Sequence, residues 1–228
     1  MQARLVSSLD LTPDVRHFEF EIADGSAFPF TPGQFVSVKE QVAGKEVTRA
    51  YSIASPPNGN RFALCLNRVP EGLVSPRLFA LTPGEHVEVN QPLGYFTLRQ
   101  PERPAVFIAT GTGIAPFRSI LLNALTQSAP ITLLFGARHP HGVLYRNEFE
   151  ELTQRHPHFR FIPTITRPDD TWAGAVGRVQ AHLDAALAYH EITPDVYICG
   201  MKEMVDDVRA LLKQKGFERK QIIYEKYD

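Results

Sequence analysis

Residues 1–98 alternate apolar and polar positions in short runs, with turn residues between the runs. In Phe18–Ile22 the alternation has the period of a half-buried strand. Turn signals such as Thr31-Pro32-Gly33 and Thr82-Pro83-Gly84 separate such runs. Further strands are predicted at Phe35–Val38, Val47–Ile53, Phe62–Asn67, Val87–Val89 and Phe96–Leu98. Roughly five to seven short antiparallel strands predict a small closed β-barrel.

One helical segment interrupts these predicted strands. It covers residues 75–81, with Ser75 as the candidate N-cap and Pro76 at the first helical position. The residues just before it, Gly72-Leu73-Val74-Ser75, would point backbone N–H groups at the space beside the helix start, where an anion is favoured. An ordinary helix cap is the alternative interpretation of the same residues.

The pattern changes after residues 100–104, where two prolines end the last predicted strand. We therefore expect one domain over residues 1–100 and a second over residues 101–228. Ala105–Ala109 is a continuous apolar run, as expected for a parallel strand buried on both faces. Strands then alternate with helices: strands at Ile131–Phe135, Phe161–Thr166, Val196–Cys199 and Ile222–Tyr224, and helices near 116–126, 146–154, 179–188 and from Met201 to Lys215. This order predicts a doubly wound α/β domain with a parallel sheet.

Composition excludes several classes of protein. The 228 residues carry a formal net charge of −1, which gives no electrostatic footprint for nucleic acid. No apolar run approaches the ~20 residues of a membrane-spanning helix, and the N-terminus lacks the pattern of a signal peptide, so we expect a cytoplasmic protein without membrane insertion. Two cysteines are too few for a zinc site or a cysteine-ligated iron–sulfur cluster. The His139/His141 and His156/His158 pairs lack a completing carboxylate or thiol, so we expect no metal site.

The segment Arg49-Ala50-Tyr51-Ser52-Ile53 carries the first group of candidate binding residues. Strand geometry places Arg49 and Tyr51 on one face and Ser52 on the other. Arg offers a charged fork to phosphate, Tyr a flat face with a polar tip, and Ser a small hydroxyl. A flavin nucleotide needs these three things, for its pyrophosphate, its rings and a ring nitrogen. A strand with one surface Arg and one half-buried Tyr is the alternative.

A second group follows the strands of the α/β half. In an open parallel sheet the ligand crevice lies at the carboxyl ends of the strands. The first strand runs into Thr110-Gly111-Thr112-Gly113-Ile114-Ala115-Pro116, where glycines let the backbone approach a pyrophosphate. Pro116 stands in place of the third glycine of the full dinucleotide motif. Three arginines at or after later strand ends could converge on one phosphate, or could be solvated surface residues: Arg138, Arg167 after Thr166, and Arg178.

The last candidates lie at the final two strands. Cys199-Gly200 ends a strand, and Cys199 is either a small buried apolar residue or a polarizable side chain beside a reacting ring. The chain ends Tyr224-Glu225-Lys226-Tyr227-Asp228. Tyr227 is either a packing residue or a lid over a flat cofactor.

Together these motifs resemble the ferredoxin–NADP⁺ reductase superfamily over nearly the whole chain. The resemblance implies that Arg49 pairs with the FAD pyrophosphate, that Tyr51 lies against the isoalloxazine and that Ser52 approaches its N5. Gly72–Ser75 is similar to the second pyrophosphate motif, and 94–96 to the barrel's last strand. Residues 111–116 resemble the nicotinamide-domain signature, and Cys199-Gly200 the pair near nicotinamide C4. Glu225 and Tyr227 line up with the terminal Glu and the flavin-covering aromatic residue.

Two departures from the family pattern affect what the resemblance implies. Asp228 follows the terminal Tyr where plant-type members stop, which weakens the lid role of Tyr227. The multi-domain dioxygenase reductases of the superfamily carry a fused ferredoxin domain, which two cysteines exclude here. The electron acceptor must then be a separate molecule.

The resemblance therefore implies an FAD-dependent oxidoreductase that moves hydride between NADPH and flavin N5 and passes electrons singly to or from a ferredoxin or flavodoxin. Ser52, Cys199, Glu225 and Tyr227 are the expected catalytic residues, and the three arginines favour NADPH, with NADH possible. Three alternatives share these motifs: an NADH-dependent reductase for free flavin, a globin or an oxygenase partner; an electron-transfer subunit of a larger complex; and a flavin-binding sensor. We expect a monomer.

Overall fold

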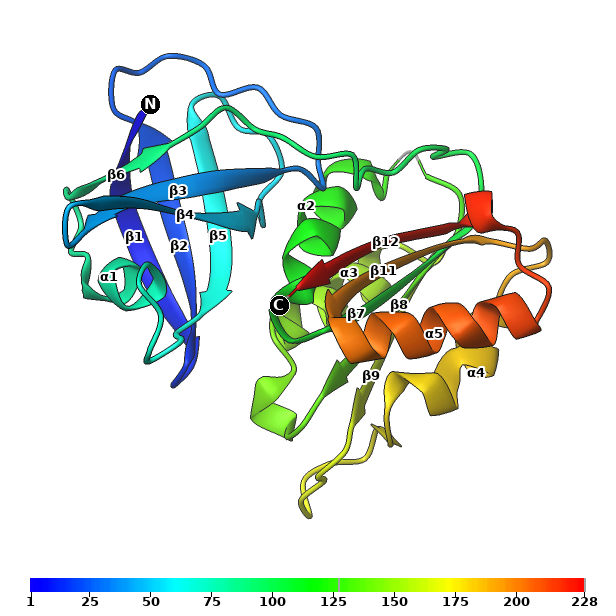
Figure 1. Cartoon of the computed structure of the whole chain (residues 1–228). Helices are drawn as coiled ribbons and strands as arrows, with labels where there is room; N and C mark the ends of the chain where they lie inside the picture. The colour runs from blue at the N-terminus through cyan, green and yellow to red at the C-terminus, as the bar shows by residue number, and fades with distance from the viewer. Residues whose placement is uncertain (127, 228) are drawn as a thin grey trace. The chain divides into compact units, whose positions relative to one another are not determined.

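The computed structural model describes residues 1–126 and 128–227. Asp228, which bears on the lid role of Tyr227, lies outside the described residues. Contacts divide the chain into two compact units, each coloured by residue number in Figure 1. The first unit contains Met1–Leu98 together with Ala115–Asn123, and the second contains Arg99–Ile114 together with the chain from Ala124 onward.

The first unit is built on six antiparallel strands. Hydrogen bonding arranges them in the order β4-β3-β6-β1-β2-β5. The two outer strands also meet, because Ile53 bridges Leu64 and the Ala54 N–H donates to the Ala63 carbonyl at 2.7 Å. The predicted closed barrel is therefore confirmed. The strands are β1 Gln2–Thr12, β2 Val15–Ile22, β3 Phe35–Val42, β4 Lys45–Ser52, β5 Arg61–Asn67 and β6 His86–Val89.

Inward-facing aromatic and branched side chains fill the barrel. Phe20 stacks on Phe62 with ring centroids 5.6 Å apart, and Phe28 lies 4.7 Å from Phe62. These three rings and Leu5 are almost fully buried. Alternation along β1 and β2 produces this core, because every second side chain of a strand points to the same face.

Two local predictions for the first unit are wrong. The helix α1 (Ser75–Ala80) begins at Ser75 itself, and the Ser75 Oγ accepts the Val69 N–H at 2.9 Å instead of capping the helix. Residues 96–98, expected as the last strand, are irregular. Only Leu93 bridges Phe35, and Gly94 then turns the chain with a φ of +107°, which ends the pairing.

The second unit is a parallel sheet of six strands in the order β10-β9-β8-β7-β11-β12. The order reverses between β7 and β11, which is the switch point of a doubly wound fold. Figure 1 shows α4 and α5 on one face of the sheet and α3 on the other, so the predicted α/β class is confirmed. The strands are β7 Ala105–Thr110, β8 Ile131–Ala137, β9 Phe159–Ile165, β10 Ala175–Val176, β11 Asp195–Met201 and β12 Ile222–Tyr227.

The helices that follow these strands differ slightly from the prediction. Residues 179–188 form a 3₁₀ turn before a short α-helix. Met201, expected on the apolar face of the last helix, ends β11 and is 58% exposed. The helices are α2 Ile114–Ala124, α3 Arg146–Arg155, α4 Leu183–Leu187 and α5 Lys202–Gln214, with 3₁₀ turns η1 Gly111–Gly113, η2 Pro140–Gly142, η3 Val179–His182 and η4 Arg219–Gln221. No helix among the described residues is both long and apolar enough to cross a membrane.

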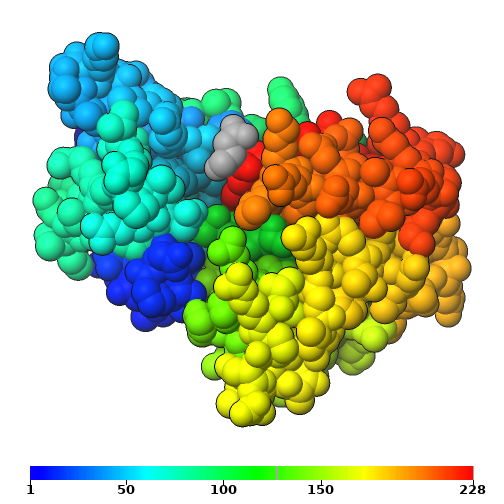
Figure 2. All heavy atoms as spheres, turned by 60° about the horizontal axis from the view of Figure 1, so that its bottom comes forward, coloured from blue at the N-terminus to red at the C-terminus, as the bar shows by residue number. Residues whose placement is uncertain are grey.

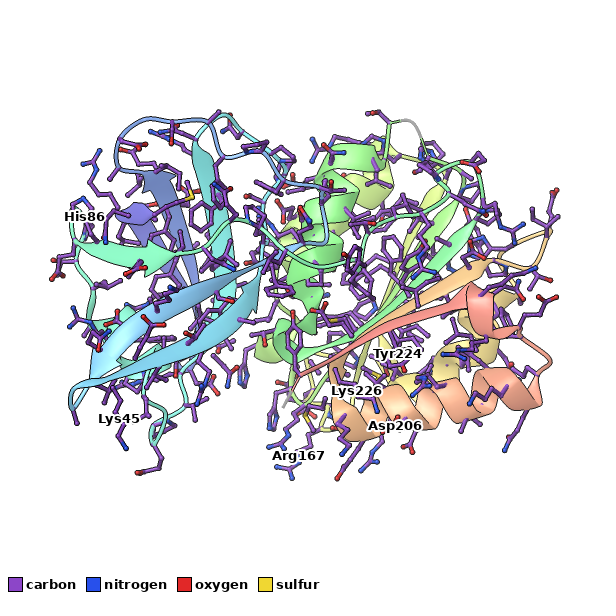
Figure 3. All side chains as sticks on the ribbon, turned by 45° about the horizontal axis from the view of Figure 1, so that its top comes forward. Lys45, His86, Arg167, Asp206, Tyr224 and Lys226 are labelled. Carbon is purple, nitrogen blue, oxygen red and sulfur yellow. The ribbon has the colours of Figure 1, made fainter. Side chains whose placement is uncertain are left out.

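Side chains of β12 hold this edge strand against α5. Lys226 Nζ lies 2.7 Å from an Asp206 carboxylate oxygen, and the Arg209 guanidinium lies 3.7 Å from the centroid of the Tyr224 ring. Figure 3 shows Asp206, Tyr224 and Lys226 grouped between the strand and the helix. These contacts fix the register of the last strand, on which Glu225 and Tyr227 are carried.

The buried ring of His190 is expected to make the stability of the second unit depend on pH. Its Nε2 lies 3.1 Å from Thr132 Oγ1, while its Nδ1 is buried and has no partner among the described residues. Burial lowers the pKa of His190 below its ordinary value of 6.5. Below that value the unfolded chain takes up a proton that the folded ring resists, so the free energy of unfolding should fall as the pH falls.

We expect His190→Gln to reduce this loss of stability. Urea unfolding at about pH 8 and about pH 5.5 should give a smaller difference for the variant than for the unchanged protein, because the amide does not titrate. His86→Gln, at an exposed position of β6, is the control and should leave the difference unchanged. An equal difference in all three proteins would contradict this role of His190.

Candidate functional site

The carboxyl ends of the central strands bring most candidate residues of the second unit to one edge of the sheet. In register, Cys199 lies opposite both Ala109 of β7 and Glu225 of β12. Thr110 lies opposite Gly136 of β8. The residues that follow these strands therefore share one edge of the second unit, at the switch point of the sheet.

Backbone-to-backbone packing at this edge depends on glycine. A Cβ on Gly113 would overlap the carbonyl of Cys199, and a Cβ on Gly200 would overlap the hydroxyl of Thr110. Gly200 also has a φ of +147°, and Gly111 a φ of +55°. No atom of the described residues lies within 4 Å of the position that a Cβ on Gly111 would take, which leaves open space above it among these residues. Thr112 follows in the same 3₁₀ turn, and Pro116 is buried as the third residue of α2.

Thr110, which the sequence analysis did not select, carries an unsatisfied hydroxyl at this edge. Its Oγ1 is buried and has no hydrogen-bond partner among the described residues. Buried polar atoms are nearly always bonded to protein, water or ligand. An orphan hydroxyl beside two glycines that leave the backbone accessible fits a polar ligand such as a nicotinamide nucleotide. A threonine directly before a glycine-rich turn was the available sequence signal.

Backbone hydrogen bonds bring the three candidate arginines to the neighbouring strand ends. The Arg167 N–H donates to the Arg138 carbonyl at 2.8 Å, and the N–H of Thr166 donates to Ala137 at 3.2 Å. The chain before Arg178 is bound in the same way, since the Gly177 N–H donates to Ile165 at 2.8 Å. All three arginines are exposed, in a part of the second unit whose residues 165–180 are yellow in Figure 2.

The guanidinium groups of these arginines have no polar partner among the described residues. Arg138, Arg167 and Arg178 form no side-chain hydrogen bond or ion pair with any residue that the structure describes. Three unpaired guanidinium groups near one sheet edge favour an anionic ligand, and each offers the paired donors that bind phosphate. The arrangement suits a nucleotide that carries an extra phosphate.

Cys199 is held as a neutral thiol. It is fully buried, and burial raises its pKa well above the ordinary value, with the negative charge of Glu225 acting in the same direction. A hydrogen bond with Tyr227 opposes the shift. Since a reactive cysteine requires a thiolate, Cys199 is unsuited to nucleophilic attack. Glu225 and Tyr227 are half-buried on β12 and adjoin this thiol.

In the first unit, β4 presents Arg49, Tyr51 and Ser52 near its end. Arg49 is exposed, and its guanidinium donates to the Thr48 carbonyl at 2.9 Å. Tyr51 packs against the barrel core, and burial raises its pKa to about 12, while the charge of Arg49 acts in the opposite direction. Ser52 is buried, at 5% exposure, and Ile53 beside it lies in the core.

The Gly72–Ser75 segment lies in the same unit. The Gly72 N–H donates to the Val69 carbonyl at 2.8 Å, so the segment opens with a tight turn. Leu73 is half exposed, Val74 is buried, and Ser75 uses its oxygen to accept the Val69 N–H. An ion pair of 2.7 Å between Arg77 and Glu40 of β3 ties α1 to the β3–β4 hairpin that carries Arg49.

The histidine, cysteine and carboxylate side chains of the described residues do not gather into a metal-binding group. No group of three or more histidine, cysteine or carboxylate residues that could hold an ion is found among residues 1–126 and 128–227. His139 and His141 stack on one another with ring centroids 5.3 Å apart, and His158 Nε2 lies 2.6 Å from the Leu125 carbonyl.

Comparison with known proteins matches both halves of the chain to oxidoreductases. Residues 2–98 match the family model of the oxidoreductase FAD-binding domain, and residues 107–210 match that of the oxidoreductase NAD-binding domain. The chain is 42% identical to ferredoxin–NADP reductase B of Sorangium cellulosum, over 100% of this chain and 97% of that protein. The chain belongs to the ferredoxin–NADP reductase family. It is an FAD- and NAD(P)-binding oxidoreductase without an iron–sulfur domain in the sequence described.

Other members of the family are longer than this chain. The toluate 1,2-dioxygenase electron transfer component of Pseudomonas putida is 30% identical over 99% of this chain, which spans 67% of that protein. The ferredoxin reductase of carbazole 1,9a-dioxygenase has a similar structure, with a TM-score of 0.85 and 26% identity over 100% of this chain and 69% of that one. The family thus includes members that differ in what accompanies the two shared domains.

Substitution of Thr110 tests whether its hydroxyl contributes to ligand binding without contributing to protein stability. We expect Thr110→Val to weaken NADP⁺ binding roughly tenfold, because one hydrogen bond worth about 1.4 kcal/mol is lost. Thermal stability should stay equal or rise, since the buried hydroxyl has no protein partner to lose. Isothermal titration and thermal unfolding of the FAD-loaded protein measure the two effects. Thr110→Ser keeps the hydroxyl and is the control, and a less stable Val variant with unchanged NADP⁺ binding would contradict the assignment.

Proposed function

We propose that this oxidoreductase transfers electrons between NADPH and a separate one-electron carrier, a ferredoxin or a flavodoxin, through bound FAD. The observation that carries the proposal is the alignment with ferredoxin–NADP reductase B, which spans 100% of this chain and 97% of that relative. FAD, when bound, accepts hydride at N5 and supplies the conversion from two-electron to one-electron chemistry. The protein contributes binding, orientation and exclusion of water.

Residues 1–100 form the proposed FAD domain. Arg49 binds the pyrophosphate, and its exposure and lack of a carboxylate partner among the described residues support this role. Tyr51 lies against the isoalloxazine, with its ring held in place by the barrel core. Ser52 donates or accepts at N5 and Ile53 anchors the strand behind it. Gly72, Leu73, Val74 and Ser75 provide the second set of pyrophosphate contacts.

Residues 101–228 form the proposed nicotinamide domain. Gly111, Thr112 and Gly113 cradle the pyrophosphate, and Pro116 sets the start of the following helix. Arg138, Thr166, Arg167 and Arg178 bind the 2′-phosphate that distinguishes NADPH from NADH. The unpaired state of the three guanidinium groups supports this role, because a buried or paired arginine would have to give up a partner first.

The hydride-transfer residues are proposed to be Ser52, Cys199, Glu225 and Tyr227, with Gly200 allowing close approach of the nicotinamide. Cys199 serves as a neutral, polarizable wall, which its raised pKa supports. Glu225 and Tyr227 orient the amide and ring that occupy the site. We also propose that the protein acts in the cytoplasm as a monomer.

A second function is favoured by a specific relative. The toluate 1,2-dioxygenase electron transfer component is 30% identical over 99% of this chain. The chain would then use NADH and deliver electrons to an oxygenase. The arginine cluster is the feature that distinguishes the two functions, since NADH has no 2′-phosphate for it to bind.

Arg49→Ala should yield a folded protein that purifies largely without FAD. Loss of a charge-assisted bond to the pyrophosphate costs about 1.5–3 kcal/mol, or roughly a 10–100-fold weaker affinity. The ratio of flavin to protein absorbance measures the loss, and circular dichroism measures the fold. Lys45→Ala removes a positive charge from an exposed position of the same strand and should retain FAD. A fully flavinated Arg49→Ala protein would exclude Arg49 from the site.

Anaerobic stopped-flow reduction tests the coenzyme and the redox function together. FAD-loaded protein mixed with NADPH should lose its flavin absorbance faster than protein mixed with NADH. Arg167→Gln should lower the rate constant per NADPH concentration roughly 10–100-fold, with little change for NADH, because one charged phosphate contact is removed.

Arg155→Gln on α3 is the control for this measurement. Arg155 is a comparably exposed arginine that pairs with Glu151. Its substitution should therefore leave the rate constants of reduction by NADPH and by NADH unchanged. If NADH reduced the flavin faster than NADPH did, and Arg167→Gln did not change that rate, delivery of electrons from NADH to an oxygenase would be favoured over the NADPH-dependent function proposed first. Absence of reduction by either coenzyme would refute both.

A further inference from the structure

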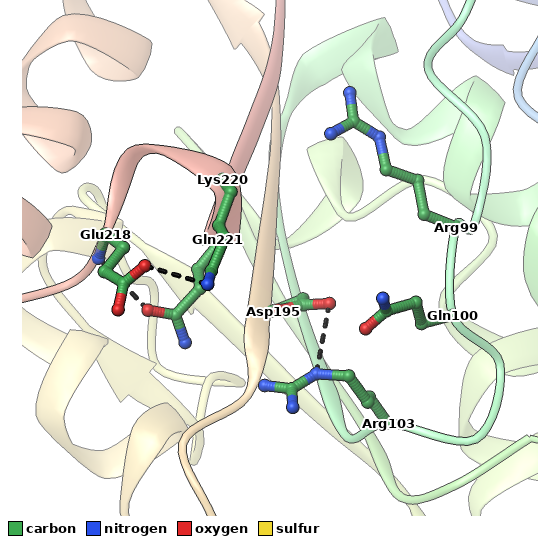
Figure 4. Close-up of a pocket in the computed structure, with 7 residues that line it drawn as sticks. All are labelled: Arg99, Gln100, Arg103, Asp195, Glu218, Lys220 and Gln221. Carbon is green, nitrogen blue, oxygen red and sulfur yellow. Dashed lines mark hydrogen bonds and ion pairs between the residues drawn. The ribbon is translucent and has the colours of Figure 1, made fainter.

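A polar hollow lies at the amino-terminal ends of the parallel strands in the second unit, opposite the ends that carry the glycine-rich turn. It has a volume of about 520 Å³, within the range of roughly 300–1,000 Å³ for small-molecule sites. Residues 99–103 before β7, the first residue of β11 and the turn η4 before β12 form its walls (Figure 4). The strand β11 is seven residues long and spans about 20 Å from the hollow at its amino-terminal end to Gly200 near its carboxyl end. A ligand here would be distinct from the coenzyme.

The walls of the hollow are held in place by backbone hydrogen bonds. The Arg99 N–H donates to the Tyr197 hydroxyl at 3.0 Å, and the Asp195 N–H donates to the Pro104 carbonyl at 2.9 Å. On the other side, Glu218 and Gln221 exchange hydrogen bonds between side chain and backbone and close the turn η4. The hollow is therefore formed before any ligand binds, which reduces the entropic cost of binding.

Positive charge exceeds negative charge in the lining. Arg99, Arg103 and Lys220 carry three positive charges, against the carboxylates of Asp195 and Glu218. Lys220 lies 3.0 Å from Glu218, but both side chains are well exposed, so the pair is weak. The Arg99 side chain makes no hydrogen bond or ion pair with the residues that the structure describes. Arg99 and Lys220 are both exposed, and they would have to turn toward one another from the directions shown in Figure 4 to bind one phosphate.

Asp195 supplies the second feature of the site. It is 8% exposed, and its only side-chain ion pair with a described residue is to Arg103 Nε, at 3.5 Å. That distance exceeds the 2.7–3.2 Å of an ordinary N–H···O hydrogen bond. A carboxylate has four acceptor positions, and the Asp195 oxygens are not among the fully buried atoms without a partner, so they remain open to the hollow and its solvent. Such a group favours a ligand that brings O–H donors into the hollow.

The lining also excludes some ligands. Among the described residues it contains charged and amide side chains, including Gln100 and Gln221, but no aromatic or aliphatic side chain on which a base could stack. We propose that the hollow binds a small phosphorylated polyol, such as a sugar phosphate. Arg99 and Lys220 bind the phosphate, and Asp195 and the amides of Gln100 and Gln221 accept or donate hydrogen bonds to the hydroxyls. Nothing in this site depends on the proposed redox function.

Calorimetric titration of the FAD-loaded protein with glucose 6-phosphate tests the proposal. Glucose and inorganic phosphate serve as matched probes, since each carries half of the recognised chemistry. We expect glucose 6-phosphate to bind at least tenfold more tightly than either. Arg99→Gln should weaken its binding at least tenfold, while Arg219→Gln, a neighbouring arginine outside the lining, should have no effect.

Asp195→Asn tests recognition of the hydroxyl groups separately from recognition of the phosphate. It should weaken glucose 6-phosphate binding about tenfold while leaving inorganic phosphate binding equal or tighter, because a negative charge is removed. If this variant does not fold, the Arg99→Gln comparison still decides. Absence of binding, binding that Arg167→Gln abolishes and Arg99→Gln does not, or equal affinity for inorganic phosphate would overturn the proposal.

Discussion

The second unit depends on one close approach of two backbones at the switch point of its sheet. Gly113 packs against the carbonyl of Cys199, and Gly200 packs against the hydroxyl of Thr110, at distances that leave no room for a Cβ. This contact sets the turn η1 directly beside the end of β11. It therefore determines where the open backbone above Gly111 lies relative to the Cys199 thiol.

Burial then divides the functional groups into two kinds. Groups in the strands, such as Ser52, Cys199 and the Thr110 hydroxyl, are buried and uncharged, and burial itself keeps the Cys199 thiol protonated. The charged groups, such as Arg49 on β4 and Arg167 after β9, are exposed. Charge that must remain solvated until a ligand arrives has to lie at the surface, because an unpaired buried arginine would cost several kcal/mol.

Hydrophobic periodicity predicted nearly all of the fold. Convergence of Arg138 and Arg167 was one of two interpretations, because neighbouring parallel strands end close together, and a backbone hydrogen bond does join the two residues. The wrong predictions are local. Phe96–Leu98 has a strand-like pattern, but Gly94 turns the chain away, and the Ser75 hydroxyl bonds Val69 because a tight turn brings that N–H within reach. The position of Thr110 before a glycine-rich turn is visible in the sequence, but whether its hydroxyl lacks a partner depends on packing.

The hollow was unpredictable for a related reason, since Arg99, Asp195 and Lys220 are far apart in sequence and meet only through the register of β7, β11 and β12. The same physical constraint nonetheless applies at both ends of the strands. Interior strands bury both faces, so a polar side chain within them needs a partner, as Thr132 and Thr164 have, and unpartnered polar groups are favoured near the strand ends. Thr110 ends β7 with a buried hydroxyl that has no partner among the described residues, and Asp195 begins β11 with a carboxylate that is open to the hollow. An unfilled buried group costs about 1–3 kcal/mol. A coenzyme that bonds the Thr110 hydroxyl would remove this cost at one end of the sheet, and the proposed ligand would occupy acceptor positions of Asp195 at the other end.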